Sequence, residues 1–95
     1  MMFEVGDKTE RKVRLSKEYW SKIRKKHPEV GSEGMIKETL ENPVKIVNHS
    51  FDESRCKFYR YYKNRGHSEK NLMVLVKYLN GRGFVVTSYF IDKIN

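Results

Sequence analysis

Several features that would assign a protein to a common class are scarce in this chain of 95 residues. Its one cysteine excludes an internal disulfide and a cysteine-based zinc cage. Its longest purely apolar run, Leu72–Val76, is far too short to span a bilayer. The first residues, Met-Met-Phe-Glu-Val-Gly-Asp, carry acids where a secretory signal would carry cations and a long apolar stretch. The sequence therefore predicts a cytoplasmic protein without a membrane partner.

The chain also lacks the patterns of several catalytic chemistries. No Gly-rich phosphate loop opens a helix, and no histidine pair has the i, i+4 spacing of a zinc site. The expected central strands carry no carboxylates, which metal-dependent nucleases need in a cluster. We therefore expect neither a metal nor another cofactor. A metal-independent enzyme on nucleic acid would act on RNA, whose own 2′-OH can attack the adjacent phosphate.

Positive charge is abundant and unevenly placed, with a net charge of +8. Residues 8–27 contain nine Lys or Arg and two acids, and residues 54–70 contain six and one. Residues 28–53 between them contain two Lys and six acids. If the fold brings the two basic blocks together, they form a face that attracts polyanions and binds them in a salt-dependent way. This distribution favours a nucleic-acid partner over a generally basic surface.

The first half of the chain predicts a short strand followed by two helices. Lys12–Leu15 alternates polar and apolar residues as a strand does. Ser16 is a good N-cap for a helix over Lys17–His27, which should end there because the residue before Pro28 avoids the α conformation. A second helix is expected over residues 32–42.

The second half of the chain predicts β-structure. The expected strands are Val44–Asn48, Lys57–Lys63, Leu72–Leu79 and Phe84–Ile91. Asn80-Gly81-Arg82-Gly83 is a strong hairpin signal. Residues 1–11 form either a first strand, in which Phe3 and Val5 alternate with polar residues, or a loosely ordered end. We expect a single α+β domain over residues 1–95, with two N-terminal helices packed on one face of a four- to five-stranded antiparallel sheet and the other face free.

The expected strand at residues 57–63 combines cations with aromatic rings. One of its faces carries Lys57, Tyr59, Tyr61 and Lys63, and the other carries Cys56, Phe58, Arg60 and Tyr62. The first face suits a sugar-phosphate chain whose bases need a stacking surface. A solvated edge strand, in which lysines prevent aggregation and tyrosines half-bury their rings, explains the same pattern.

His27 is the sharpest candidate for proton transfer. Histidine ordinarily titrates near neutral pH, so it can give or take a proton there. Lys25 and Lys26 directly before it would hold a phosphate nearby. The simpler explanation is a helix-terminal histidine that interacts with the last carbonyl groups. His49 and His67 lie in or beside expected loops and could supply a second proton-transfer group.

The last expected strand offers two polar side chains, Thr87 and Tyr89. Strict alternation places them on one face with Val85 and Ile91. A hydroxyl there can hold a phosphate oxygen or a 2′-OH, and a tyrosine can stack on a base. Thr and Tyr are also ordinary strand residues that need no function.

Several of these residues together resemble the barnase–EndoU–colicin–RelE-like nuclease superfamily, and within it the phage-associated branch. The resemblance spans roughly residues 12–92 and is carried by Trp20, His27-Pro28-Glu29, Leu40 with Asn42-Pro43, Tyr59–Lys63, Leu72–Lys77 and Val85–Tyr89. The His-Pro-Glu and Thr-Ser-Tyr segments are its most specific parts.

The resemblance implies two helices packed on an antiparallel sheet of about four strands, and RNA cleavage through 2′-OH attack without a metal. It implies that His27 acts as general acid or base, and that Thr87 supplies a hydroxyl with Tyr89 beside it. Arg60 or Lys63 would stabilise charge on the phosphate. These two residues should face opposite sides of their strand: alternation favours Lys63, and the family pattern leaves Arg60 open.

The favoured function is therefore an endoribonuclease that cleaves single-stranded RNA, as a toxin or a phage-linked effector. The expected RNA-binding residues are Lys57, Tyr59, Tyr61, Tyr89, Lys25 and Lys26. One alternative is a non-catalytic RNA- or DNA-binding module. Another is a basic interaction protein that meets an acidic partner, such as an antitoxin or an immunity protein.

Overall fold

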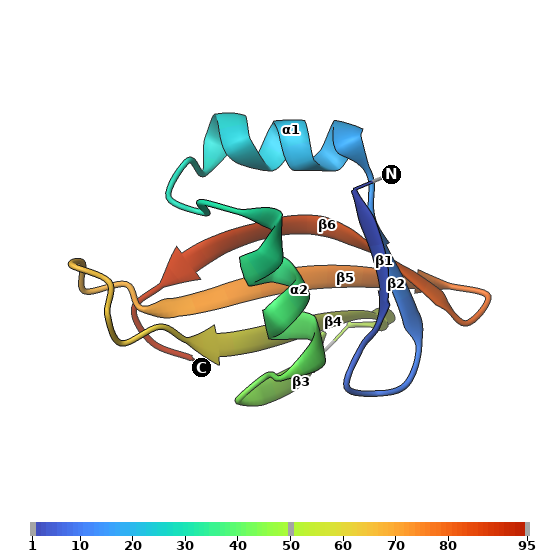
Figure 1. Cartoon of the computed structure of the whole chain (residues 1–95). Helices are drawn as coiled ribbons and strands as arrows, with labels where there is room; N and C mark the ends of the chain where they lie inside the picture. Colours follow the sequence, from blue (N-terminus) through green and yellow to red (C-terminus); the bar gives the residue numbers. More distant parts are fainter. Residues whose placement is uncertain (1, 50, 95) are drawn as a thin grey trace.

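The computed structural model describes residues 2–49 and 51–94 as six strands and two helices (Figure 1). In chain order these are β1 (Phe3–Gly6), β2 (Lys12–Leu15), α1 (Lys17–Lys26), α2 (Glu33–Glu41), β3 (Lys45–His49), β4 (Asp52–Tyr61), β5 (Asn71–Leu79) and β6 (Arg82–Ile91). The α+β class and the two helices are confirmed. No helix among these residues is long and apolar enough to cross a membrane.

The six strands form one mixed sheet in the order β1-β2-β6-β5-β4-β3. Neighbouring strands are antiparallel except β2 and β6, which run parallel. The prediction of four or five antiparallel strands is therefore wrong in number and in direction. The chain returns to β2 only after both helices and the β3–β6 meander, and such a long connection allows a parallel pair. Residues 3–6 form an ordered strand, so both helices follow two strands.

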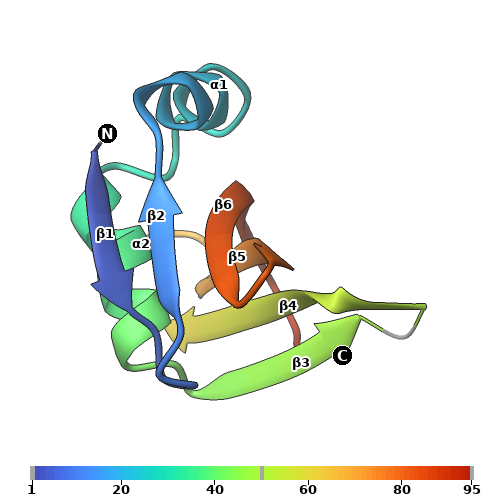
Figure 2. The same ribbon diagram turned by 90° about the vertical axis from the view of Figure 1, so that its right-hand side faces the viewer.

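The helices also do not share one face of the sheet, which corrects the expected packing. α2 crosses the sheet and packs on β1, β4 and β5, whereas α1 lies along β6 (Figure 1). The short strand β2 pairs with β6 only at Arg82–Phe84. The rest of that edge of β6 would expose unpaired backbone groups, and α1 covers it. Figure 2 shows α1 above β2 and β6, and α2 on one side of the sheet.

The core lies between α2 and the sheet, with α1 closing its upper edge. Its fully buried members are mostly branched aliphatic side chains from alternate strand positions and from the inner faces of the helices. They include Val13, Leu15, Ile23, Val30, Ile36, Leu40, Phe58, Leu72, Val74, Val76 and Val85. Side chains at the intervening positions of β3–β6 point to the opposite side, which we call the open face.

A β-bulge in β6 decides which side chains reach the open face. Leu75 lies opposite Thr87, but its neighbour Val76 lies opposite Val85, so one residue of β6 is extra. Val85 is therefore buried in the core, while Thr87 and Tyr89 are half-buried on the other side. The predicted grouping of Val85 with Thr87 is wrong because the bulge breaks the strict alternation that the grouping assumed.

Candidate nucleic-acid interface

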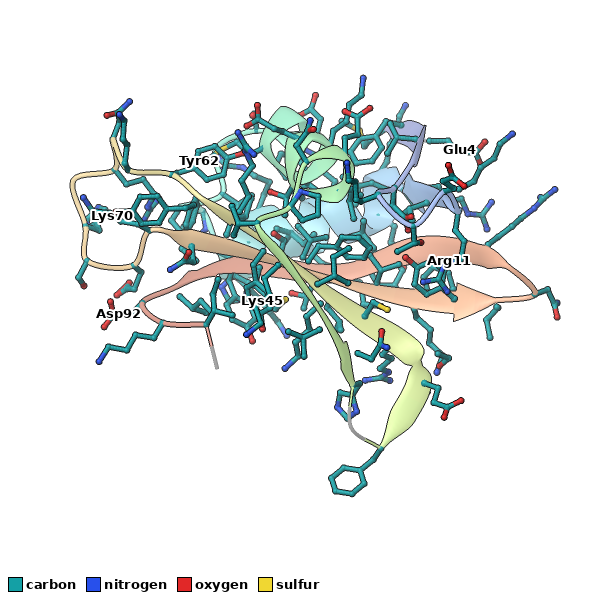
Figure 3. All side chains as sticks on the ribbon, turned by 90° about the horizontal axis from the view of Figure 1, so that it is seen from below. Glu4, Arg11, Lys45, Tyr62, Lys70 and Asp92 are labelled. Atoms are coloured by element: carbon teal, nitrogen blue, oxygen red, sulfur yellow. The ribbon has the colours of Figure 1, made fainter. Side chains whose placement is uncertain are left out.

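The open face carries a continuous cross-strand row of side chains. In the strand register Lys45 lies opposite Tyr59, Tyr59 opposite Met73, and Met73 opposite Tyr89. The His27 ring then contacts the Tyr89 ring in a tilted arrangement, with ring centroids 5.0 Å apart and an interplanar angle of 40°. We call these five residues the Tyr89 row. The row joins four strands to the end of α1. In Figure 3 its first member, Lys45, lies apart from Tyr62, which is on the α2 side of the sheet.

A hollow of about 360 Å³ lies on the open face beside this row. Its lining consists of two lysines, two tyrosines and three apolar side chains: Val47, Lys57, Tyr59, Met73, Tyr89, Ile91 and Lys93. Hollows of this size can hold a small ligand or a single base, and the lysines and tyrosines here give the lining a largely polar character. Lys93 was missed at the sequence level; the signal for it was its position two residues after the last strand.

The other expected contacts on this face lie in the rows on either side. Lys57 and Thr87 both pair with Leu75, so they are separated by one strand, or about 10 Å. Tyr61 lies opposite Asn71 on the other side of the row and is 52% exposed. The structure therefore brings Lys57, Tyr59, Tyr61, Thr87 and Tyr89 to one face.

Tyr59 is buried, as is its neighbour Met73, and it keeps its proton at neutral pH. Burial raises the pKa of its hydroxyl, and the neighbouring Tyr89 hydroxyl raises it further. The two hydroxyls are thus close enough to influence each other, and both are available as hydrogen-bond donors. Such donors can bind phosphate oxygens or the 2′-OH of a ribose.

His27 is held in place by the end of α1 and by an acidic neighbour. It is the C-cap residue of α1, and its backbone N–H donates to the Ile23 carbonyl at 2.7 Å. Its Nδ1 atom lies 3.6 Å from Glu29 Oε2. The carboxylate lies on the Nδ1 side of the ring and leaves Nε2 for a substrate. From the sequence, Glu29 was only the last residue of the His-Pro-Glu segment. The turn at Pro28 brings its carboxylate to the His27 ring.

Lys25 and Lys26 occupy the last turn of α1, and both are exposed. Cations at this end of a helix interact favourably with its dipole. Their backbone positions, one and two residues before His27, place them at the same end of the open face as the Tyr89 row.

Arg60 lies on the α2 side of β4 and is engaged by the protein itself. Its Nη1 donates to the Asn42 carbonyl at 2.7 Å, and its Nε lies 3.2 Å from Glu38 Oε1, an ion pair without hydrogen-bond geometry. The Tyr62 hydroxyl donates to the same carboxylate oxygen at 2.7 Å. The structure does not bring Arg60 to His27; instead Arg60 ties the end of α2 to β4.

The carboxylate in this cluster is electrostatically stabilised. The hydrogen bond from Tyr62 and then the charge of Arg60 lower the pKa of Glu38. Burial first, and then Glu38, raise the pKa of Tyr62 to about 12. The expected strand end at Lys63 was two residues too late, because β4 ends at Tyr61.

Lys63 and the remaining histidines also lie away from the Tyr89 row. Lys63 lines a hollow at the end of β4 together with Met35, Tyr62 and the exposed Tyr61, which therefore also borders the α2 side. His49 ends β3, where its Nδ1 accepts a hydrogen bond from the Phe51 N–H at 3.3 Å. His67 is exposed in the β4–β5 loop. His27 is thus the histidine that the fold brings to the open face.

Comparisons of this chain with protein-family models, with curated proteins and with solved structures found no match. Within residues 2–49 and 51–94, no three His, Cys, Asp or Glu side chains gather as ligands of a metal ion.

Proposed function

We propose that this protein binds single-stranded RNA on the open face and cleaves it without a metal. The observation that carries the proposal is the Tyr89 row, in which Tyr59 and Tyr89 lie on either side of Met73, Tyr89 contacts the His27 ring, and Lys57 and Thr87 lie in the neighbouring row. Bases stack on aromatic side chains, and cations beside them follow the phosphates. The half-buried Tyr89 and the exposed Tyr61 supply the rings, and Lys45, Lys57 and Lys93 supply the charge.

In the cleavage step, His27 accepts the proton of a ribose 2′-OH through Nε2. The 2′ oxygen attacks the adjacent phosphorus, and the bond from phosphorus to the 5′ oxygen breaks. The 5′ oxygen leaves with a proton from water, which gives a 2′,3′-cyclic phosphate and a 5′-hydroxyl. Glu29 stabilises the protonated ring, and Lys57 with the Thr87 hydroxyl stabilises the charge that develops on the phosphate.

The resemblance to the nuclease superfamily supports the same location for the site. Its two most specific segments, residues 27–29 and residues 87–89, lie together because the His27 ring contacts Tyr89. In this proposal Lys57 takes the phosphate-binding role that the resemblance implies for Arg60 or Lys63. A role as a toxin or phage-linked effector follows from the same resemblance.

The test is incubation of the purified protein with end-labelled RNA in EDTA. We expect cleavage to leave cyclic phosphate ends, and His27→Ala to reduce the rate at least about a hundredfold. His67→Ala is the matched control, because this histidine is exposed in a loop, and it should cleave like the wild type. Absence of cleavage by the wild type at every pH would reject the enzymatic proposal.

A non-catalytic RNA-binding module is the second candidate. One observation favours it: within the described part of the chain, the structure brings no second histidine to His27. Such a module would bind RNA with a steep salt dependence, and His27→Ala would hardly change its affinity. If the open face meets an acidic protein instead, RNA will not bind and an acidic partner will co-purify in stoichiometric amount.

A further inference from the structure

A second hollow lies at the opposite end of α1, about 330 Å³ in volume. Its walls come from three elements: Arg14 of β2, Ser16 and Tyr19 at the start of α1, and Phe84 and Val85 of β6. Two aromatic rings and one guanidinium group therefore line it. The Ser16 hydroxyl is already engaged, since it accepts the Tyr19 N–H at 3.1 Å.

This end of the sheet is rich in positive charge. The parallel register puts Lys12 opposite Arg82 and Arg14 opposite Phe84. These residues also line an adjoining hollow of about 180 Å³, which Glu4 enters from β1 as its one acid. Three cations around an aromatic hollow suit a base with its attached phosphates.

The two ends of the molecule are connected along β6. Phe84 and Tyr89 are five residues apart on this strand and both lie on the side away from α2, about 16 Å from each other. α1 runs beside this span, with Tyr19 near its start and His27 at its end. A stacked strand rises about 3.4 Å per nucleotide, so roughly five nucleotides cover the distance, and fewer if the strand is stretched.

We propose that the hollow lined by Arg14, Tyr19 and Phe84 is a second base-binding subsite for the RNA strand that His27 and Tyr89 engage. This inference rests on the proposed RNA-binding function and adds a path and a length to it. The RNA strand follows the open face of β6, beside α1. One base occupies the hollow at Tyr89, and another, several nucleotides away, stacks on Phe84 while its phosphate meets Arg14.

The test compares a uridine dinucleotide with a uridine octanucleotide, both carrying 2′-O-methyl riboses so that they cannot be cleaved. The dinucleotide reaches one hollow, whereas the octanucleotide reaches both. We expect Phe84→Ala to weaken octanucleotide binding at least about fivefold and to leave dinucleotide binding at Tyr89 unchanged. Arg14→Gln, at an exposed position, should act in the same direction and guards against a folding defect in Phe84→Ala.

The outcomes separate this inference from the function on which it rests. If neither oligonucleotide binds the wild type, the RNA-binding proposal itself fails. If the octanucleotide binds but Phe84→Ala and Arg14→Gln leave its affinity unchanged, the second subsite is rejected and the proposal for the Tyr89 row stands. If Phe84→Ala weakens both oligonucleotides equally, Arg14→Gln decides: selective weakening of the octanucleotide supports the second subsite, and unchanged octanucleotide affinity rejects it.

Discussion

Strand β4 and the residue that follows it present a tyrosine and a cation to each side of the sheet, and the two sides use them differently. On the α2 side, Arg60 and Tyr62 both contact Glu38, and Arg60 also donates to a helix-terminal carbonyl. On the open face, Tyr59 borders a hollow, and Lys57 takes part in no ion pair with the described residues. The same residue types therefore stabilise the fold where the protein satisfies them, and can bind a ligand where it does not.

The strongest way to break this comparison is to remove one ring from each side. Tyr89→Ala should weaken RNA binding by about 1–3 kcal/mol, because a base loses its stacking partner. Tyr62→Phe should leave RNA affinity unchanged and lower the free energy of unfolding by about 1 kcal/mol, because Glu38 loses a hydrogen bond. Fluorescence anisotropy with labelled RNA measures the first effect, and urea denaturation measures the second. If Tyr62→Phe weakened RNA binding and Tyr89→Ala did not, the roles given to the two sides of the sheet would be refuted.

Removing the arginine tests whether Arg60 has a structural role. Arg60→Met should lower the free energy of unfolding by about 1 kcal/mol, a value that allows for solvent screening of a pair whose side chains are 31% and 49% exposed. Cleavage rate and RNA affinity at a temperature where the variant is folded should equal those of the wild type. A loss of cleavage with an intact fold would restore Arg60 to the site.

Removing the lysine has a smaller effect, visible mainly in its salt dependence. Lys57→Gln should weaken RNA binding a few-fold and lower the slope of log affinity against log salt by about 1, because one phosphate contact is lost. Lys37→Gln is the control, since Lys37 is exposed on α2 and not on the open face. An unchanged slope in Lys57→Gln would remove this residue from the interface.

The smallest expected effect is a pH dependence of stability on the α2 side. The pKa of Glu38 is lowered in the folded state, so its contribution is present above the ordinary value of 4.5 and is lost as the pH falls through the folded value. The free energy of unfolding of the wild type should therefore fall more steeply from about pH 5 to about pH 3 than that of Glu38→Gln. Parallel curves would show that the pairing contributes nothing.

Much of the open face could be predicted from local patterns. Alternation within β4 assigned Tyr59 and Tyr61 to one side and Arg60 to the other, because a strand without interruption has a strict period of two. The cap at Ser16 and the stop at Pro28 located the end of α1, and with it His27. These features depend on residues that are neighbours in the sequence.

The rest depends on contacts between distant segments, which local patterns do not contain. Nothing in Lys12–Leu15 indicates that it pairs in parallel with the start of β6, or that α1 then covers the remaining edge. The extra position of the bulge in β6 is not a glycine, so the sequence gives no local signal that predicts the bulge. Lys63 was expected on the strand because its type fits, but the chain leaves the sheet two residues earlier.

The bulge in β6 has a consequence for the shape of any bound strand. It separates the half of β6 that carries Phe84 from the half that carries Thr87 and Tyr89, and bulges bend and twist the strand that contains them. A nucleic acid that touches both halves must follow a curved path. A flexible single strand can do so easily, whereas a duplex is stiff over this length and resists bending. In the proposed function, this extra residue in β6 would favour unpaired RNA over double-stranded RNA without contacting a base.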